Sequence, residues 1–256
     1  MVGAVALVAG GGVIVAAQLA AAMMFLQFAI GAVNDIVDAP ADSGRVPPKP
    51  IPAGLVTMGE ARGIAALSAA MGLAIPPQVG LVTLVLGLLV LAVGAAYDLF
   101  AKGTPWSWLP FAVGIPILPV YGWLGATGSL PPSFAILIPM AMLAGAALAV
   151  ANARADLAAD LASGTQSVAT RLGAERSWWA GTALMSAAVG LGLVGLVGAR
   201  GDTASWVVVM AGVGLLAVGL ALGLGERESR RRAWEVQAVG AAIAAIGWVW
   251  GMTPGA

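Results

Sequence analysis

The chain has 256 residues, of which 60% are hydrophobic and only 9% charged, and its mean hydropathy is +0.96, values typical of a membrane protein. Twelve basic residues balance twelve acidic ones, so the net charge gives no reason to expect a nucleic-acid partner. The absence of cysteine and histidine excludes disulfides, haem attachment, thiolate catalysis and an imidazole base, and it disfavours zinc.

The N-terminal stretch 2–9 is apolar but short, because Gly10, Gly11 and Gly12 interrupt it. It is either a helix stub or the hydrophobic part of a signal peptide, and no positively charged region precedes it to support the second interpretation. Longer apolar runs approach the roughly 20 residues that a helix needs to cross a bilayer. They predict transmembrane helices at 13–33, 55–75, 79–97, 105–125, 134–152, 178–199, 203–224 and 235–252.

These continuous runs differ from the short alternating segments of a transmembrane β-barrel. We therefore expect an all-α, polytopic membrane bundle with eight full transmembrane helices and a short ninth at the N-terminus, around a central cavity open to the cytoplasm. The connecting stretches leave no room for a soluble domain. Residues 1–256 are thus predicted to form one domain with pseudo-repeated halves, about 1–125 and 126–256.

The basic residues predict the orientation of the bundle in a cell membrane. Alternate loops, at 34–62, 97–104, 152–176 and 225–235, contain eleven of the twelve lysines and arginines, and only Arg200 lies in the intervening loops. Loops rich in lysine and arginine stay in the cytoplasm. The sequence therefore predicts a multi-pass protein with these four loops, and any site built on them, facing the cytoplasm.

Two acidic clusters share the spacing N-x3-D-x3-D and fall on this same side. The first contains Asn34, Asp35, Asp38 and Asp42, and the second contains Asn152, Asp156 and Asp160. The second set should occupy one face of a single helix, because residues four apart are neighbours on a helix surface. In the first cluster Pro40 should end the helix, so that Asp42 reaches the site from a loop.

Five carboxylates in one cavity would repel each other, and Mg²⁺ is the cation that oxygen-only ligands favour. Such Mg²⁺ ions commonly complete their shell with substrate phosphates. The nearby basic residues suit the remaining phosphate oxygens; they are Arg45, Lys49, Lys102, Arg154 and Arg171. The residues thus suggest a Mg²⁺-held diphosphate at the mouth of an apolar bundle, although a solvated charged rim or a cation transporter built from two repeats would also explain acidic residues here.

At these residues the sequence resembles the UbiA superfamily of intramembrane prenyltransferases. Its first signature, NDxxDxxxD, runs from Asn34 to Asp42 and continues to "KPIPAG" at 49–54. Its second, DxxxD, is matched by Asp156 and Asp160 and continues to "TRLG" at 170–173, in a form most like the menaquinone-type branch that prenylates dihydroxynaphthoate. The tyrosine and lysine of the central loop are matched by "YDLFAKG", from Tyr97 onward. The family usually has a complete first helix, which looks shortened here.

The resemblance implies Mg²⁺-assisted ionisation of an allylic isoprenoid diphosphate and capture of the cation by an aromatic acceptor. It implies Mg²⁺ binding by Asp35, Asp38, Asp42, Asp156 and Asp160, and orientation of ligands by Asn34 and Asn152. The diphosphate would be contacted by Arg45, Lys49, Tyr97, Lys102 and Arg171. Asp98, beside Tyr97, would accept the acceptor's proton or pair with Lys102. Asp35, Asp38, Asp156 and Asp98 are the predicted catalytic residues.

Two alternatives stay open on the sequence alone. A UbiA-type terpene cyclase would ionise the same diphosphate and let the cation attack its own chain. A transporter or non-catalytic membrane protein would show no turnover. The expected partners are an isoprenoid diphosphate, a lipophilic or aromatic acceptor and the lipid bilayer, with no nucleic acid.

Overall fold

The computed structural model describes residues 1–43, 48–75 and 80–253, and every regular element within these ranges is helical. In chain order the elements are α1 (Val2–Val8), α2 (Val13–Asp38), α3 (Met58–Ala74), α4 (Leu81–Ala96), the π-helical turn η2 (Tyr97–Ala101), α5 (Leu109–Thr127), α6 (Phe134–Ala155), α7 (Leu157–Ser163), α8 (Val168–Leu172), α9 (Ala174–Ala199), α10 (Thr203–Leu222) and α11 (Arg227–Gly251). The predicted all-α membrane bundle is confirmed.

The predicted number of full spans is not confirmed. Among the described residues, seven helices are long and apolar enough to cross a membrane: α2, α4 continued by η2, α5, α6, α9, α10 and α11. The predicted span 55–75 corresponds to α3, whose 17 residues extend about 25 Å, less than the roughly 30 Å of a hydrocarbon core. A capping box fixes its start, because Thr57 and Glu60 each bond the other's backbone N–H.

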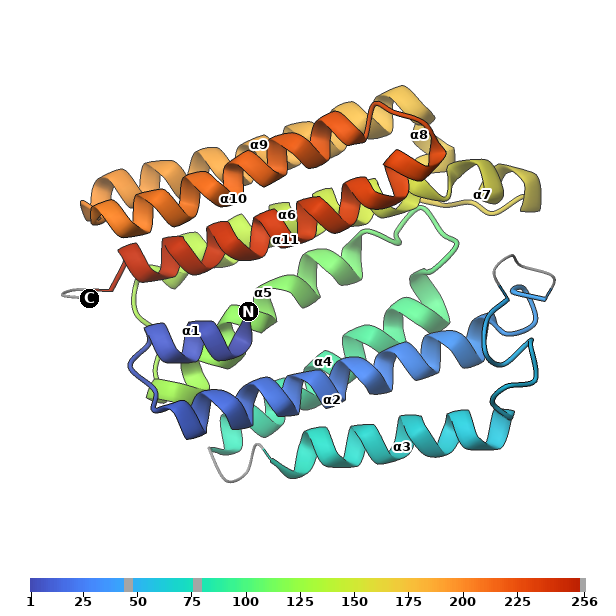
Figure 1. Ribbon diagram of the computed structural model, residues 1–256, viewed down its shortest axis with the longest axis horizontal. Coiled ribbons are helices and arrows are strands. Elements are labelled where there is room, and N and C mark those ends of the chain that lie inside the picture. Colours follow the sequence, from blue (N-terminus) through green and yellow to red (C-terminus); the bar gives the residue numbers. More distant parts are fainter. Residues whose placement is uncertain (44–47, 76–79, 254–256) are drawn as a thin grey trace.

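Figure 1 shows the long helices running alongside one another. They extend from α3 at one side of the molecule, through α2, α4 and α5, to α6 and α11, with α9 and α10 at the other side. Direct contacts join α2 to α3, α5 to α6, α6 to α9 and α10 to α11. The core has one buried cluster around Leu19 and Tyr121, and two in the second half of the chain around Trp248 and Met185.

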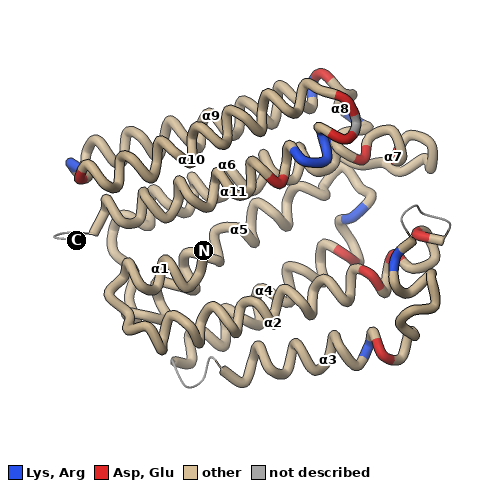
Figure 2. The backbone as a smooth tube through the Cα atoms, in the orientation of Figure 1, with Lys and Arg blue, Asp and Glu red and all other residues tan. Residues whose placement is uncertain are grey.

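Charged residues gather at one end of the bundle, which we call the charged end (Figure 2). It comprises the ends of α2, η2 and α6, the short helices α7 and α8, and the starts of α3, α9 and α11. At the opposite end, Arg200 ends α9 and Asp202 caps α10. The segregation follows from the alternating helix directions, since every second connection returns to the same end.

Glycines bring α10 and α11 into close contact. A Cβ atom added to Gly212 of α10 would lie 2.5 Å from the Ala244 backbone nitrogen and 2.7 Å from the Gly240 carbonyl oxygen of α11. Lipid tails are as apolar as the side chains, so the hydrophobic effect does not drive membrane helices together. They associate largely through close packing of this kind. Gly214, two residues further along α10, has nothing within 4 Å of the equivalent position.

We therefore expect Gly212→Ala to lower the free energy of unfolding by about 1–3 kcal/mol, because the added methyl group overpacks a backbone contact. Gly214→Ala is the matched control and should leave stability unchanged or slightly raised, since alanine favours helix over glycine. Thermal unfolding of both variants in the same detergent measures the difference. Equal melting temperatures would contradict the assignment of this helix contact.

Candidate active site

The first acidic cluster lies at the junction of α2 and the turn that follows it. α2 ends at Asp38, and residues 39–43 form turns, so the helix ends just before Pro40 as predicted, although Ala39 keeps helical angles (φ −48°, ψ −41°). The Asp42 backbone N–H donates to the Asp38 carbonyl oxygen at 2.9 Å, an α-turn bond that keeps Asp42 close to the helix end. Asp42 is only 7% exposed. The prediction that it reaches the cluster from outside the helix is confirmed.

Lys49 neutralises two of these carboxylates. Its Nζ atom lies 2.7 Å from Asp35 Oδ1 and 3.1 Å from Asp42 Oδ2. Partial burial acts to lower the pKa of Lys49, but the hydrogen bonds and negative charges of Asp35 and Asp42 outweigh it and raise the pKa above the usual 10.5. Lys49 is therefore a fixed positive charge at this site near neutral pH.

The π-helical turn η2 supplies the opposite wall. Its wider turn lets the Lys102 backbone N–H donate to the Tyr97 carbonyl oxygen at 2.8 Å, five residues back. The Lys102 ammonium forms an ion pair with Asp38 Oδ2. The ion pair predicted as one role for Asp98 therefore goes to Asp38, although Lys102 lies within electrostatic range of Asp98.

Asp98 is instead bound by the first asparagine of the motif. Asn34 Nδ2 donates to Asp98 Oδ1 at 2.7 Å, and Asp98 is 5% exposed. Its second oxygen, Oδ2, is buried and has no hydrogen-bond partner within the described residues. An ionised carboxylate in this position keeps one oxygen free to accept a proton.

The second acidic cluster is not on one uninterrupted helix, contrary to the prediction. α6 ends at Ala155, and Asp156, with φ −95° and ψ 1°, joins it to α7. Aspartate has a low helix propensity and favours helix ends, which a spacing argument ignores. The interruption is slight, because the Asp160 N–H still donates to the Asp156 carbonyl oxygen at 2.9 Å. Burial and the Asp156 charge raise the pKa of Asp160, against a lowering by its hydrogen bond to Ser167.

Both clusters lie near Tyr97. Its side chain is within electrostatic range of Asp38 and Asp98 and also of Asp156 and Asp160. The connections around it also touch, since a Cβ atom on Gly103 would lie 3.4 Å from Thr165 Cγ2. The end of α2, the turn η2 and the junction of α6 and α7 thus place the two acidic clusters near one another at the charged end.

The basic residues predicted to accompany the second cluster form no ion pair with its aspartates within the described part of the chain. Arg154 points away from it: Nε donates to the Ala174 carbonyl oxygen at 2.8 Å and Nη1 donates to that of Gly223. Arg171 is exposed on α8 and forms no ion pair within the described part of the chain. Asn152 is half-buried in the last turn of α6. Arg45 lies outside the described residues.

An apolar cavity of about 450 Å³ begins at Tyr97 and runs between α1, α2, α4 and α5. At its charged end the rings of Tyr97 and Phe111 meet edge to face, 5.2 Å between centroids at 83°. Gln27 also lines this cavity and was not predicted as a site residue. It could have been found from the sequence, because it is a polar residue inside the apolar run of α2, seven positions before Asn34.

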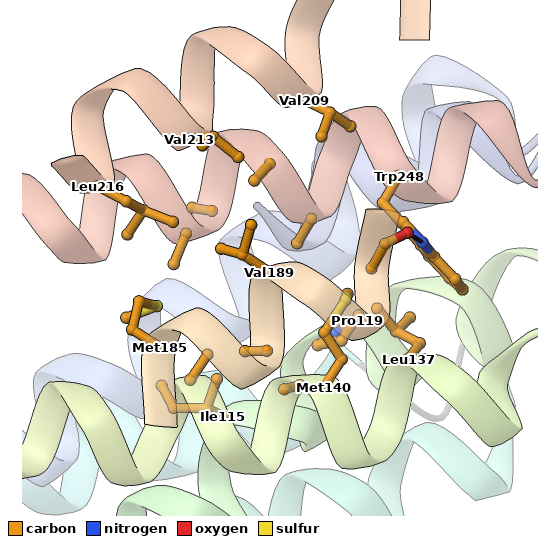
Figure 3. Close-up of a pocket in the computed structure, with 18 of the residues that line it drawn as sticks. Ile115, Pro119, Leu137, Met140, Met185, Val189, Val209, Val213, Leu216 and Trp248 are labelled. Carbon is orange, nitrogen blue, oxygen red and sulfur yellow. Dashed lines mark hydrogen bonds between the residues drawn. The ribbon is translucent and has the colours of Figure 1, made fainter. Parts of the chain in front are cut away.

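A second cavity, of about 260 Å³, lies between α5, α6, α9, α10 and α11 (Figure 3). Figure 3 shows the side chains that converge on it, among them Met140, Met185, Val213 and Leu216. The indole N–H of Trp248 is already used, donating to the Gly192 carbonyl oxygen at 2.8 Å. Met1, Ile115 and Leu118 line both cavities, so the interior of the bundle offers two adjoining apolar chambers.

The fold and the motifs have counterparts among known proteins. The sequence matches the UbiA prenyltransferase family over residues 1–245. Compared with curated proteins, the chain has no significant match.

Three solved structures illustrate the shared fold. A UbiA homologue from Aeropyrum pernix K1 is 22% identical, with a TM-score of 0.78 over 96% of this chain and 93% of that one. A digeranylgeranylglyceryl phosphate synthase structure is 17% identical, with a TM-score of 0.72 over 98% and 91%. A UbiA homologue from Archaeoglobus fulgidus bound to GPP and Mg²⁺ is 14% identical, with a TM-score of 0.64 over 98% and 95%. Since the family match spans nearly the whole chain, the protein belongs to the UbiA prenyltransferase family.

Proposed function

We propose that this intramembrane prenyltransferase uses Mg²⁺ to ionise an allylic isoprenoid diphosphate and transfers the prenyl group to an aromatic, quinone-precursor-like acceptor. The observation that carries the proposal is the position of Tyr97. It lies among carboxylates from both halves of the chain and at the start of an apolar cavity. A diphosphate with a hydrocarbon tail needs these two environments side by side.

The donor atoms of the site suit Mg²⁺. They are carboxylate and amide oxygens, the ligands this cation favours. Within the described ranges no three acidic side chains stand close enough to hold an ion by themselves, so each Mg²⁺ would be held by one or two carboxylates together with phosphate oxygens. The carboxylates proposed to hold such ions are Asp35, Asp38, Asp42, Asp156 and Asp160, and the ions would supply positive charge that stabilises the departing diphosphate. A structural neighbour bound to GPP and Mg²⁺ supports this proposal.

The protein's own cations would hold the diphosphate. Lys49 and Lys102 each carry three N–H donors, so Lys49 can keep its two aspartates and Lys102 its one, and each can still donate to a phosphate oxygen. The Tyr97 hydroxyl is within electrostatic range of both acidic clusters and would donate to the same group. Arg45 and Arg171 would reach the diphosphate from outside, and Asn34 and Asn152 would orient its ligands.

The reaction breaks the allylic C–O bond, and the bonding electron pair leaves with the diphosphate. Tyr97 and Phe111 both line the cavity and meet edge to face, and a ring face left open at its mouth would stabilise the allylic cation. A ring carbon of the acceptor then forms the new C–C bond and loses its proton. Asp98 Oδ2, buried and without a hydrogen-bond partner among the described residues, is the proposed proton acceptor.

The prenyl tail would extend from Tyr97 into the first cavity. The second cavity would hold either the far end of this tail or a lipophilic part of the acceptor. The walls support this assignment, because both chambers are lined almost entirely by hydrocarbon side chains. Phe28 is 54% exposed on the outside of α2, so it is not part of these walls.

We further propose that the charged end faces the cytoplasm. It holds the basic residues Arg62, Lys102 and Arg176, while the opposite end holds Arg200. Retention of lysine and arginine on the cytoplasmic side supports this orientation. Water-soluble diphosphate would then leave into the cytoplasm.

Replacing Asp38 or Asp156 by asparagine should lower the rate of diphosphate release by about 100-fold or more, because each change removes a negative charge that holds the catalytic cation. The matched control is Asp202→Asn at the opposite end of the bundle. Asparagine can still cap α10 there, so activity should remain. The assay uses purified protein, Mg²⁺ and geranyl, farnesyl or geranylgeranyl diphosphate with a panel of aromatic acceptors. Full activity of both site variants would refute the metal assignment.

The same assay separates transfer from cyclisation. A transferase should release diphosphate in proportion to prenylated acceptor, and omission of the acceptor should slow the release by about tenfold or more, because no nucleophile then captures the cation. Mass spectrometry of the organic phase identifies the products. Undiminished release without acceptor, accompanied by a cyclic hydrocarbon or alcohol, would instead show a terpene cyclase.

A further inference from the structure

A small polar pocket lies at the charged end, on the side of α6 opposite the acidic site. It is enclosed by α6, α9, α10 and α11 and has a volume of about 20 Å³. Arg154 lines it from the last turn of α6, two residues from Asn152 and two from Asp156. Two residues correspond to about 200° around a helix, so the Arg154 side chain leaves α6 on the other face from the two acidic-site residues.

The side chains of this pocket leave hydrogen-bonding capacity unused. Arg154 spends two N–H groups on the carbonyl oxygens that end α10 and begin α9. The Arg230 guanidinium has no hydrogen bond or ion pair within the described residues, and its Nε is fully buried. Thr182 Oγ1 is also buried without a partner there. Gln237, 3% exposed, also lines this pocket.

The pocket also carries unbalanced positive charge. Arg154 and Arg230 are close enough to repel each other. The ion pairs of the described chain lie elsewhere, at Lys49, Lys102 and Arg232. Two like charges in a partly desolvated place are unfavourable unless an anion lies between or beside them. The unsatisfied N–H and O–H donors and the positive charge would thus both be satisfied by an anion that accepts hydrogen bonds.

We propose that this pocket binds a phosphate group, carried by an anionic phospholipid headgroup or by free phosphate. Guanidinium groups bind phosphate through paired, charge-assisted N–H···O bonds, and serine, threonine or amide side chains complete such sites. The cavity itself holds only one or two water-sized groups, so the phosphate sits at its mouth with its oxygens directed inward.

The surroundings favour the lipid headgroup as the source. Trp178 lines the pocket and meets Trp179 edge to face, 4.7 Å between ring centroids, and Trp179 is 59% exposed. Exposed tryptophans at helix ends mark the level of the headgroups in a membrane. Basic pockets between transmembrane helices at that level bind anionic headgroups.

The test compares Arg230→Gln with its neighbour Arg231→Gln, which is exposed on α11 and lines no pocket described here. Native mass spectrometry of the full chain in detergent measures binding of phosphatidylglycerol and of phosphatidylcholine. The parent protein should prefer phosphatidylglycerol. Arg230→Gln should weaken phosphatidylglycerol binding by about fivefold or more, and Arg231→Gln by less than twofold. Equal loss in both variants would show diffuse surface attraction and overturn the proposal.

Thermal unfolding gives a second measurement, which distinguishes loss of the binding site from misfolding of the variant. Without lipid or phosphate, Arg230→Gln should melt at the parent's temperature or above, because it removes a repulsion. Phosphatidylglycerol should raise the melting temperature of the parent but not of Arg230→Gln. A matching rise with inorganic phosphate would identify free phosphate as a sufficient ligand, and a rise with phosphatidylglycerol alone would assign the site to lipid. No response of the parent to either would refute the site.

Discussion

A carboxylate at the end of an apolar membrane helix persists only when a cation, a hydrogen-bond donor or water offsets its charge, and this requirement organises the charged end. Lys49 closes the turn after α2 onto Asp35 and Asp42, and Lys102 ties η2 to Asp38. Paired contacts of this kind cost most when one partner is removed, because the other charge is left uncompensated. The contacts that neutralise the first cluster therefore also fix the chain segments around it.

The two clusters are neutralised unequally. The first has two lysines, whereas Asp156 and Asp160 form no ion pair within the described part of the chain. The neighbouring arginine, Arg154, is turned toward the helix ends behind α6. The carboxylates of the second cluster therefore depend on water or a bound cation to offset their charge.

The sequence predicted features that depend on local chemistry and missed those that depend on distant partners. The apolar runs located the helices, and Pro40 correctly ended α2. The count of full spans was not confirmed, because the capping box of Thr57 begins α3 within the apolar run and α3 has only 17 residues. Repeat spacing suggested one helical face for the second cluster, but Asp156 interrupts the helix. No local pattern could show that Arg154 bonds carbonyl oxygens at Ala174 and Gly223, since these are 20 and 69 residues away.

The site depends on the number of residues in the π-helical turn η2 as well as on their identity. A π turn holds one more residue than an α turn, and here that residue separates Tyr97 from the Lys102 N–H that bonds back to it. Losing one residue would let α4 continue smoothly while rotating the following side chains by about 100°. Natural variation should therefore tolerate exchanged side chains at exposed positions of this turn, such as Phe100, which is 77% exposed, far better than insertions or deletions.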